Sequence, residues 1–481
     1  MVPTIFGVIL IAVGIVLMLR GSVVAMFVVV IISSLFGGSA AFILPALGGS
    51  SVPPVNVALM FLILRIVVPG SGQGDLAGDA LRENLPLAVF VVYGFVMAFV
   101  GPRLFAGIDV APMRQSNGGL FATLALAPTS QNITTAVYMV GTLLCAVGAY
   151  VACRDSRGLR GLVDAGVGAA WAHVVFGIMS IAGKGGAIAA ILTFFRNAHY
   201  AQLDEEVGGF LRISGIQPEP SSFASFGLVW FVFMFECWSL KVSPRRTGPI
   251  ALALLLILIA STSSSAYVGL AGYGGVRLLL ALGRGGKRKW VGAAVVGLVA
   301  VVGIALLASL NPGLLDSFAR IFDAVIAKKQ GSSSGLQRAF WARQGWTVFL
   351  ASDGLGIGPG SFRSSSILTA ILGSTGVVGT VAFSVYLWRL VRPSGADEPN
   401  SDDERARIGT AAKWAAVTFL FVASLVAAAA DPTALFAIFA GAALASRAAS
   451  ASPMRANRRV QPRGAAQFEV AGANASERRQ R

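Results

Sequence analysis

Charged side chains are scarce in this sequence of 481 residues: only 12% are Asp, Glu, Lys or Arg, whereas 55% are hydrophobic. Soluble domains carry about 25% charged residues, and the apolar residues here fall into repeated runs of about membrane-spanning length. An ordinary soluble protein is therefore excluded. The composition predicts an all-α, polytopic integral membrane protein, because helices satisfy their own backbone polar groups inside a bilayer.

Cysteine and histidine are also rare. Cys145, Cys153 and Cys237 lie in or at the end of apolar runs, so their spacing indicates neither a metal site nor a disulfide framework. The only histidines are His173, in an apolar run, and His199, in a polar interval. The sequence contains no dense group of carboxylates, so we expect neither a metal nor a cofactor.

Basic residues outnumber acidic ones, and the formal net charge is +16. They concentrate in segments that border apolar runs, such as RDSRGLRG (154–161), KVSPRRT (241–247) and GRGGKRKW (283–290). The positive-inside bias and attraction to anionic lipid explain this pattern. We therefore expect cytoplasmic basic segments, membrane lipids as partners and no nucleic acid.

The apolar runs predict about 12–13 transmembrane helices in a membrane domain of residues 1–446. Residues 248–282 are long enough for a hairpin of two helices, and a further span is expected at 290–308. Residues 447–481 are basic and lack a hydrophobic face, which predicts a disordered cytoplasmic tail. Alternation of the spans places three larger loops on the outer side: residues 101–133, 184–221 and 309–366.

The second outer loop contains RISGIQPEPSSFASF, which begins at Arg212 and leads into a helix. Its two prolines end any preceding helix, and the serines after them cap the next one. The exposed N–H groups of that helix start favour a nearby anion. Glu219 is then either a first-turn carboxylate that interacts favourably with the helix dipole or a catalytic carboxylate that faces Arg212.

The third loop contains an amphipathic stretch at residues 335–351. If it is helical, Arg338 and Arg343 lie about 140° apart around the axis. Either they clasp a bulky anion from two sides, or one faces a pocket and the other meets lipid headgroups. Trp341 and Trp346 suit stacking on sugar rings or isoprene units, and they suit anchoring at the membrane interface equally well.

A glycine-rich turn, SDGLGIGPGSF, follows this stretch. It lacks the GK[ST] ending and the strand context of a nucleotide-binding P-loop. The turn either offers N–H groups to a phosphate or is a plain re-entry turn. Arg363, Ser364 and Ser365 come at its end, and we expect them to bind substrate together with Arg343 and Trp341.

The two blocks RISGIQPEPSSFASF and QRAFWARQGWTVFLASDGLGIGPGSFRSSSILTAILGSTGVVG together resemble the O-antigen polymerase and O-antigen ligase superfamily of bacterial polysaccharide enzymes. The second block is most similar to the polymerases. The similar pattern is an Arg followed by Trp, an Asp-containing turn, Gly-x-Gly-x-Gly, and Ser and Arg residues before a Gly-rich helix. The two blocks cover a small part of the chain, and the remaining helices match only in number and hydropathy.

This resemblance implies a C-type glycosyltransferase architecture in a bacterial plasma membrane, with the active site on the extracytoplasmic face. It implies a polymerase that joins undecaprenyl-diphosphate-linked oligosaccharides into exopolysaccharide or O-antigen without a nucleotide sugar, beside a chain-length regulator and a flippase. Ligases of the superfamily carry a His after the turn, where this chain has Ser364, Ser365 and Ser366. That difference favours a polymerase over an O-antigen ligase.

The expected chemistry is inverting glycosyl transfer, in which the enzyme stabilises the negative charge of the departing diphosphate. Arg212 and Arg338 are predicted to do so, because guanidinium groups bind phosphate bidentately and stay charged. One of the other two arginines of the second block assists them. The predicted catalytic base is Glu219, with Asp353 or His199 as substitutes.

A lipid-linked glycan transporter or flippase is the alternative from a different class. In that case the arginines would line a path for an anionic lipid. Transporters often contain internal repeats with interrupted helices at matching positions. No repeat relates the halves of this sequence, and its arginines cluster in outer loops instead of at mid-span, so an enzyme is favoured.

Overall fold

The computed structural model describes residues 1–47, 49–69, 71–113, 121–182, 186–198, 206–207, 210–283, 333–393 and 403–460. This part of the chain is helical apart from short strands in the links. Six of its helices are long and apolar enough to cross a membrane, and shorter apolar helices pack among them. The predicted class, an all-α polytopic membrane protein, is confirmed.

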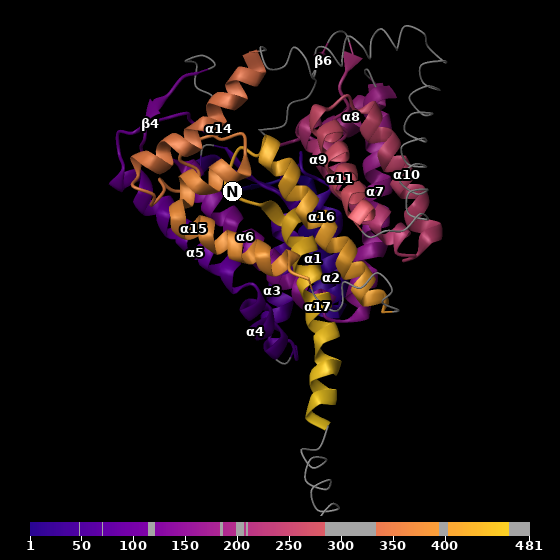
Figure 1. Ribbon diagram of the computed structural model, residues 1–481. Helices are drawn as coiled ribbons and strands as arrows, with labels where there is room; N and C mark the ends of the chain where they lie inside the picture. The colour runs from indigo at the N-terminus through magenta and orange to yellow at the C-terminus, as the bar shows by residue number, and fades with distance from the viewer. Residues whose placement is uncertain are drawn as a thin grey trace, which may run out of the picture.

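Figure 1 shows the arrangement of the described helices. In chain order they are α1 (Ile5–Arg20), α2 (Val23–Ser34), α3 (Pro54–Val67), α4 (Gly74–Glu83), α5 (Leu85–Leu104), α6 (Ser130–Cys153), α7 (Ser156–Ala182), α8 (Gly186–Phe195), α9 (Pro220–Ser239), α10 (Pro244–Ala260), α11 (Ser264–Gly283), α14 (Ser333–Ala351), α15 (Ile367–Val391), α16 (Glu404–Val426) and α17 (Thr433–Val460).

The strands are two or three residues long and pair only with antiparallel neighbours. A three-stranded sheet has the order β1 (Val2–Pro3), β2 (Phe42–Leu44), β3 (Ser50–Val52), and a short 3₁₀ turn (Pro45–Leu47) connects its last two strands. Two hairpins complete the set: β4 (Asp109–Val110) with β5 (Leu124–Ala125), and β6 (Glu206–Val207) with β7 (Phe210–Leu211).

Helix starts follow from local sequence. The Thr4 side chain accepts a hydrogen bond from Gly7 N at 3.1 Å, and the Ser22 side chain accepts one from Ala25 N at 3.1 Å. Both are N-cap hydroxyls that satisfy an otherwise unpaired backbone donor. Pro220 occupies the first turn of α9, where its missing N–H costs nothing.

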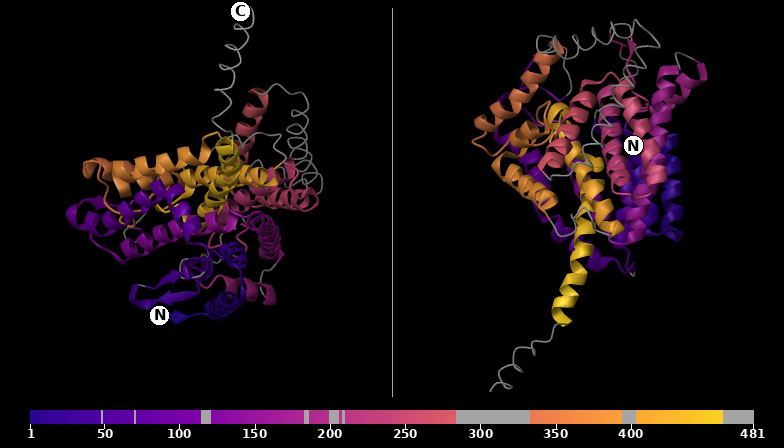
Figure 2. Two further views of the ribbon diagram at one scale, coloured as in Figure 1. Left: turned by 90° about the horizontal axis from the view of Figure 1, so that it is seen from below. Right: turned by 45° about the vertical axis from the view of Figure 1, so that its right-hand side comes forward.

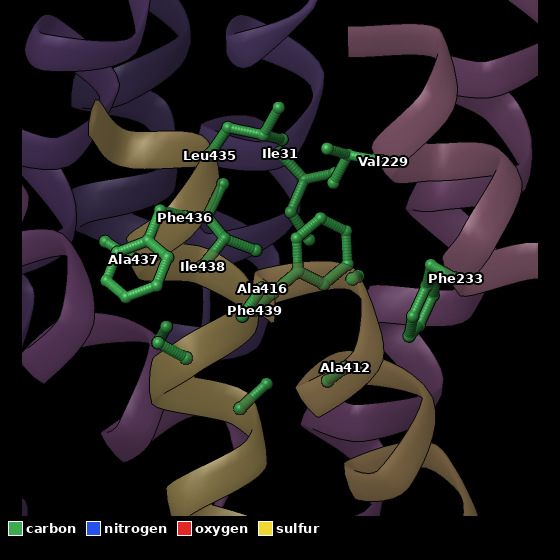
Figure 3. Close-up of a cluster of buried hydrophobic side chains, with 14 of the residues drawn as sticks. Ile31, Val229, Phe233, Ala412, Ala416, Leu435, Phe436, Ala437, Ile438 and Phe439 are labelled. Atoms are coloured by element: carbon green, nitrogen blue, oxygen red, sulfur yellow. The ribbon is translucent and has the colours of Figure 1, made fainter. Parts of the chain in front are cut away.

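The core of the bundle lies where α16 and α17 meet α2, α6 and α9. Two large side chains of α17, Phe436 and Phe439, are fully buried there. Phe439 lies beside Phe233 of α9 (Figure 3), whereas Phe436 packs against Phe383 of α15. Small residues let the helices approach closely: a Cβ on Gly441 would lie 2.4 Å from the Ala146 carbonyl oxygen of α6. Viewed from below, α16 and α17 accordingly occupy the middle of the bundle (Figure 2).

Basic links converge at one end of the bundle. Arg160 of α7 pairs with Glu404 of α16 at 2.7 Å. Arg407 Nη1 donates to the Leu240 carbonyl oxygen at 3.0 Å, which ties α16 to the end of α9. We call this region the basic end, and it comprises residues 154–160, 240–246 and 403–407.

The opposite end holds the longer links. Because α9 has 20 residues, it extends about 30 Å, so Glu219 at its start lies across the bundle from the basic end. The strand β4, the hairpin of β6 and the helix α8 lie near the top of Figure 1, whereas α4 and the end of α17 lie at the bottom. We call this region the loop end, and it comprises residues 105–113, 195–198, 212–219 and 352–366.

Two expectations about helices can be compared directly with the structure. The hairpin predicted at 248–282 is present as α10 and α11, with a turn at residues 261–263. The tail predicted to be disordered begins at residue 447, and α17 continues into it through Val460. The disorder of the tail stays a prediction, and residues 461–481 lie outside the described residues. The span predicted at 290–308 lies outside the described residues.

Candidate functional site

The glycine-rich turn packs tightly against α5, α6 and α15. Gly354, Gly356, Gly358 and Gly360 all have positive φ angles between 76° and 93°. A Cβ on Gly358 would lie 2.2 Å from the Met97 carbonyl oxygen of α5, so only glycine fits there. The backbone N–H groups of residues 356–358 already donate to Ser352 Oγ, Gly373 O and Ser374 O. This geometry favours the re-entry turn over a phosphate cradle.

Asn132, at the start of α6, anchors the same turn from the other side. Its Nδ2 donates to the Pro359 carbonyl oxygen and to Ser361 Oγ, both at 2.9 Å, while its Oδ1 accepts the Thr129 N–H. Asn132 is buried and was not among the predicted residues. A polar residue in the first turn of an apolar helix was the only sequence feature that could have indicated it.

Arg363, just after the turn, is the centre of the candidate site. Its guanidinium carbon lies 4.3 Å from the centroid of the Trp341 ring, within cation–π range. Its Nη1 donates to the Met113 carbonyl oxygen at 3.4 Å, and its backbone N–H donates to the Ala111 carbonyl oxygen at 2.9 Å. Its Nε is buried and has no hydrogen-bond partner among the described residues. The side chain is thus held in place while part of its donor capacity is unused.

Two charged groups act on Arg363. Burial lowers the pKa of its guanidinium; the carboxylate of Glu219 raises this pKa and the positive charge of Arg338 lowers it. Contacts place α14 beside the link before α15, because Ser365 Oγ donates to the Arg338 carbonyl oxygen and Trp341 stacks on Arg363. The electrostatic effect of Glu219 indicates that the start of α9 lies near them. The start of α9, which is distant in sequence, therefore shares one site at the loop end with α14 and the link that follows it.

Glu219 lies at the helix start, as the first of its two interpretations requires, and its catalytic role facing Arg212 stays a prediction. It is the N-cap residue of α9 and has extended backbone angles. Its Oε1 accepts a hydrogen bond from the Ser221 hydroxyl. It also lies close enough to Arg363 to affect that guanidinium. A carboxylate at a helix start is stabilised as an anion, so Glu219 partly neutralises the arginine pair.

Ser364 and Ser365 are buried and hydrogen-bonded within the protein. Ser365 Oγ donates to the Arg338 carbonyl oxygen at 2.6 Å, which fixes the link beside α14. Ser364 Oγ lies 2.9 Å from Thr369 Oγ1, and its N–H donates to Ala428 O at 3.0 Å. Both serines therefore shape the backbone that carries Arg363, and substrate binding by their hydroxyls stays a prediction.

The two arginines of α14 have different surroundings. Arg338 is half-buried, whereas Arg343 is exposed on another face of α14. Only one of them thus belongs to the half-buried cluster around Arg363. Trp341 lies between them and stacks on Arg363, while Trp346 is 54% exposed.

Arg212 is half-buried directly after β7, seven residues before Glu219 on the same loop. Residues 213–217 between them are buried. Of the two substitute bases, Asp353 is exposed and has a positive φ of 50° at the start of the turn. His199 lies outside the described residues. Where the structure describes the chain, no group of three or more His, Cys, Asp or Glu residues is arranged to hold a metal ion.

No protein-family model matches the sequence, and no curated protein matches it with significant similarity.

Proposed function

We propose that this protein is a membrane glycosyltransferase that polymerises undecaprenyl-diphosphate-linked oligosaccharides into exopolysaccharide or O-antigen on the outer face of the bacterial plasma membrane. The observation that carries the proposal is the half-buried cluster of Arg338, Arg363, Trp341 and Glu219 at the loop end. The proposal combines this geometry with the resemblance of the two sequence blocks to the polymerase superfamily.

The electrostatics of the cluster favour a bound dianion. Two guanidinium groups lie near each other with one carboxylate, and burial adds a desolvation cost for Arg363. An anion with two charges, such as a diphosphate, would relieve this repulsion and supply acceptors for the unpaired Nε of Arg363. A metal ion would meet net positive charge here, which supports a reaction without one.

The proposed reaction uses these groups in the following way. An acceptor hydroxyl attacks the anomeric carbon of the lipid-linked sugar, and the bond between that carbon and the diphosphate oxygen breaks. The diphosphate leaves with the bonding electrons, and Arg338 and Arg363 stabilise its charge. Glu219 takes the hydroxyl proton. Attack opposite the leaving group inverts the anomeric configuration, and Trp341 supplies a face for a sugar ring.

The test is polymer synthesis by purified protein in nanodiscs with a lipid-linked repeat unit, read as a ladder on a gel. Arg338→Ala and Arg363→Ala should each lower the rate at least about 100-fold, as removal of one transition-state charge partner does elsewhere. Arg157→Ala, an exposed arginine near the start of α7 at the basic end, is the matched control and should retain the ladder.

Other outcomes would identify the alternatives. Transfer of preformed polymer to a second acceptor without new repeat-unit bonds would indicate a ligase. Movement of lipid-linked glycan across the bilayer without new glycosidic bonds would indicate a transporter. Full ladders from both arginine variants at normal protein levels would contradict the proposed stabilisation of the departing diphosphate by Arg338 and Arg363.

A further inference from the structure

The segment that carries Glu219 into the site is buried before the helix begins. Residues 213–217 are all buried, although this link lies between a short hairpin and α9. Gly215 has a positive φ of 54°, so the backbone reverses direction there. A buried irregular segment needs partners for its backbone polar groups, and these partners determine where Glu219 is placed.

Arg196, one residue after α8, is the main partner. It is only 7% exposed. Its Nε and Nη2 donate to the Gly215 carbonyl oxygen at 2.8 and 2.5 Å, and Nη2 also donates to Ser214 Oγ at 2.6 Å. One rigid guanidinium therefore fixes two neighbouring residues at the point where the chain turns.

The other partners of this segment come from the link after α2. Gln217 Nε2 donates to the Leu35 carbonyl oxygen at 2.8 Å, and Gly38 N donates to Ile216 O at 3.2 Å. The Arg196 region is tied to the same link, since Ser39 Oγ donates to the Phe195 carbonyl oxygen at 2.6 Å. Three segments thus form one hydrogen-bonded unit at the loop end.

We propose that Arg196 is a positioning residue: by holding residues 214 and 215 it sets the placement of Glu219 relative to Arg363, a role that rests on the function proposed above. Arg196 contacts backbone and a serine hydroxyl, and it acts on the reaction only through the segment that it holds. A displacement of about 1 Å at a reacting group costs up to about 100-fold in rate. The stiffness of this segment therefore determines how well Glu219 can take a proton.

The experiment compares Arg196→Gln with Arg447→Gln, a matched control at the other end of the molecule. Arg447 Nη2 also donates to backbone carbonyl oxygens, those of Leu390 at 3.0 Å and Arg392 at 2.8 Å, and so stabilises the fold in a similar way. Amide hydrogen exchange of residues 213–219 should rise about tenfold or more in Arg196→Gln. It should not change in Arg447→Gln.

Kinetics then separate positioning from simple stability. Arg196→Gln should lower kcat about tenfold or more with KM for the lipid-linked donor within about twofold, because Arg338 and Arg363 still hold the diphosphate. Arg196→Lys should recover part of the loss, since one ammonium reaches a single acceptor. In a Glu219→Gln background, Arg196→Gln should cause no further loss, because both changes affect the same group.

Three results would overturn the proposal: unchanged exchange of residues 213–219, an unchanged kcat, or a loss of the same size in the Glu219→Gln background. A different result is that wild type is inactive, but amide exchange of residues 213–219 is slow in wild type and fast in Arg196→Gln. This result would refute the glycosyltransferase function, and Arg196 would still be the residue that positions this segment.

Discussion

At the scale of single residues, the most informative groups are those whose charge is partly removed from water. Arg363 is stabilised by aromatic stacking and by backbone contacts, and it does not depend on one carboxylate partner. Asp431, in the link between α16 and α17, is a second such group. Its Oδ1 accepts hydrogen bonds from Thr142 Oγ1 at 2.6 Å and from Thr433 N at 3.2 Å. It was not predicted from the sequence, because a lone Asp before a proline is an ordinary helix-start pattern.

Asp431 leads to a prediction about pH. Burial raises its pKa from 3.8 to about 6, and the hydrogen bonds from Thr142 and Thr433 only partly oppose this. The folded state therefore binds the proton more tightly than the unfolded state. The resulting stabilisation is complete below pH of about 4 and is lost as the pH rises through about 6. As the pH rises from 4.5 to 7.5, the unfolding midpoint of Asp431→Asn should therefore increase relative to that of wild type. Thermal unfolding followed by tryptophan fluorescence measures this difference.

The control for this prediction is Asp75→Asn, which removes an exposed carboxylate at the start of α4. The difference in unfolding midpoint between Asp75→Asn and wild type should be the same at every pH. A constant difference between Asp431→Asn and wild type over the same range would show that the Asp431 carboxylate is not the group responsible.

At the scale of elements, the turn between α14 and α15 depends on glycine for space as well as for backbone angle. Gly358→Ala would place a Cβ 2.2 Å from a carbonyl oxygen of α5 at a φ of 93°. We expect a loss of at least about 3 kcal/mol in the free energy of unfolding. Gly78→Ala, in the open on α4, should instead gain about 0.5–1 kcal/mol. Thermal unfolding in detergent measures both, and equal effects would contradict the packing of the turn.

At the scale of the whole molecule, the separation of the basic end from the loop end predicts orientation. The positive-inside rule predicts that the basic end lies in the cytoplasm. Leu124 on β5 is 50% exposed at the loop end, and Arg157 is exposed at the basic end. An impermeant maleimide should label Leu124→Cys in intact cells, and Arg157→Cys only after permeabilisation.

The wild-type protein serves as the background for that measurement. Its three cysteines, Cys145, Cys153 and Cys237, are all free and buried, so they should react little. Labelling of Arg157→Cys in intact cells would show that the basic end faces outward, opposite to the predicted orientation. The proposed site would then face the cytoplasm, and a polymerase acting on the outer face would be excluded.

The sequence by itself determined that this is a membrane protein, because helices with so few charged residues and such long apolar runs are stable only in a lipid bilayer. It also indicated Arg338, Arg363, Trp341 and Glu219 as candidates, because polar groups between apolar spans are costly and therefore conspicuous. Their spacing along the chain could not show that α9, α14 and the link before α15 converge at one point. That convergence depends on helix packing between residues more than 100 positions apart.

Only the tertiary structure decided the environment of each candidate. It placed Arg338 in the half-buried cluster and Arg343 at the surface. It paired the N–H groups of the glycine-rich turn within the protein, and it revealed Arg196 and Asn132 as the residues that hold the two site loops. The physical reason is that burial and hydrogen-bond partners belong to the packed arrangement, whereas the sequence specifies only which groups are available to be packed.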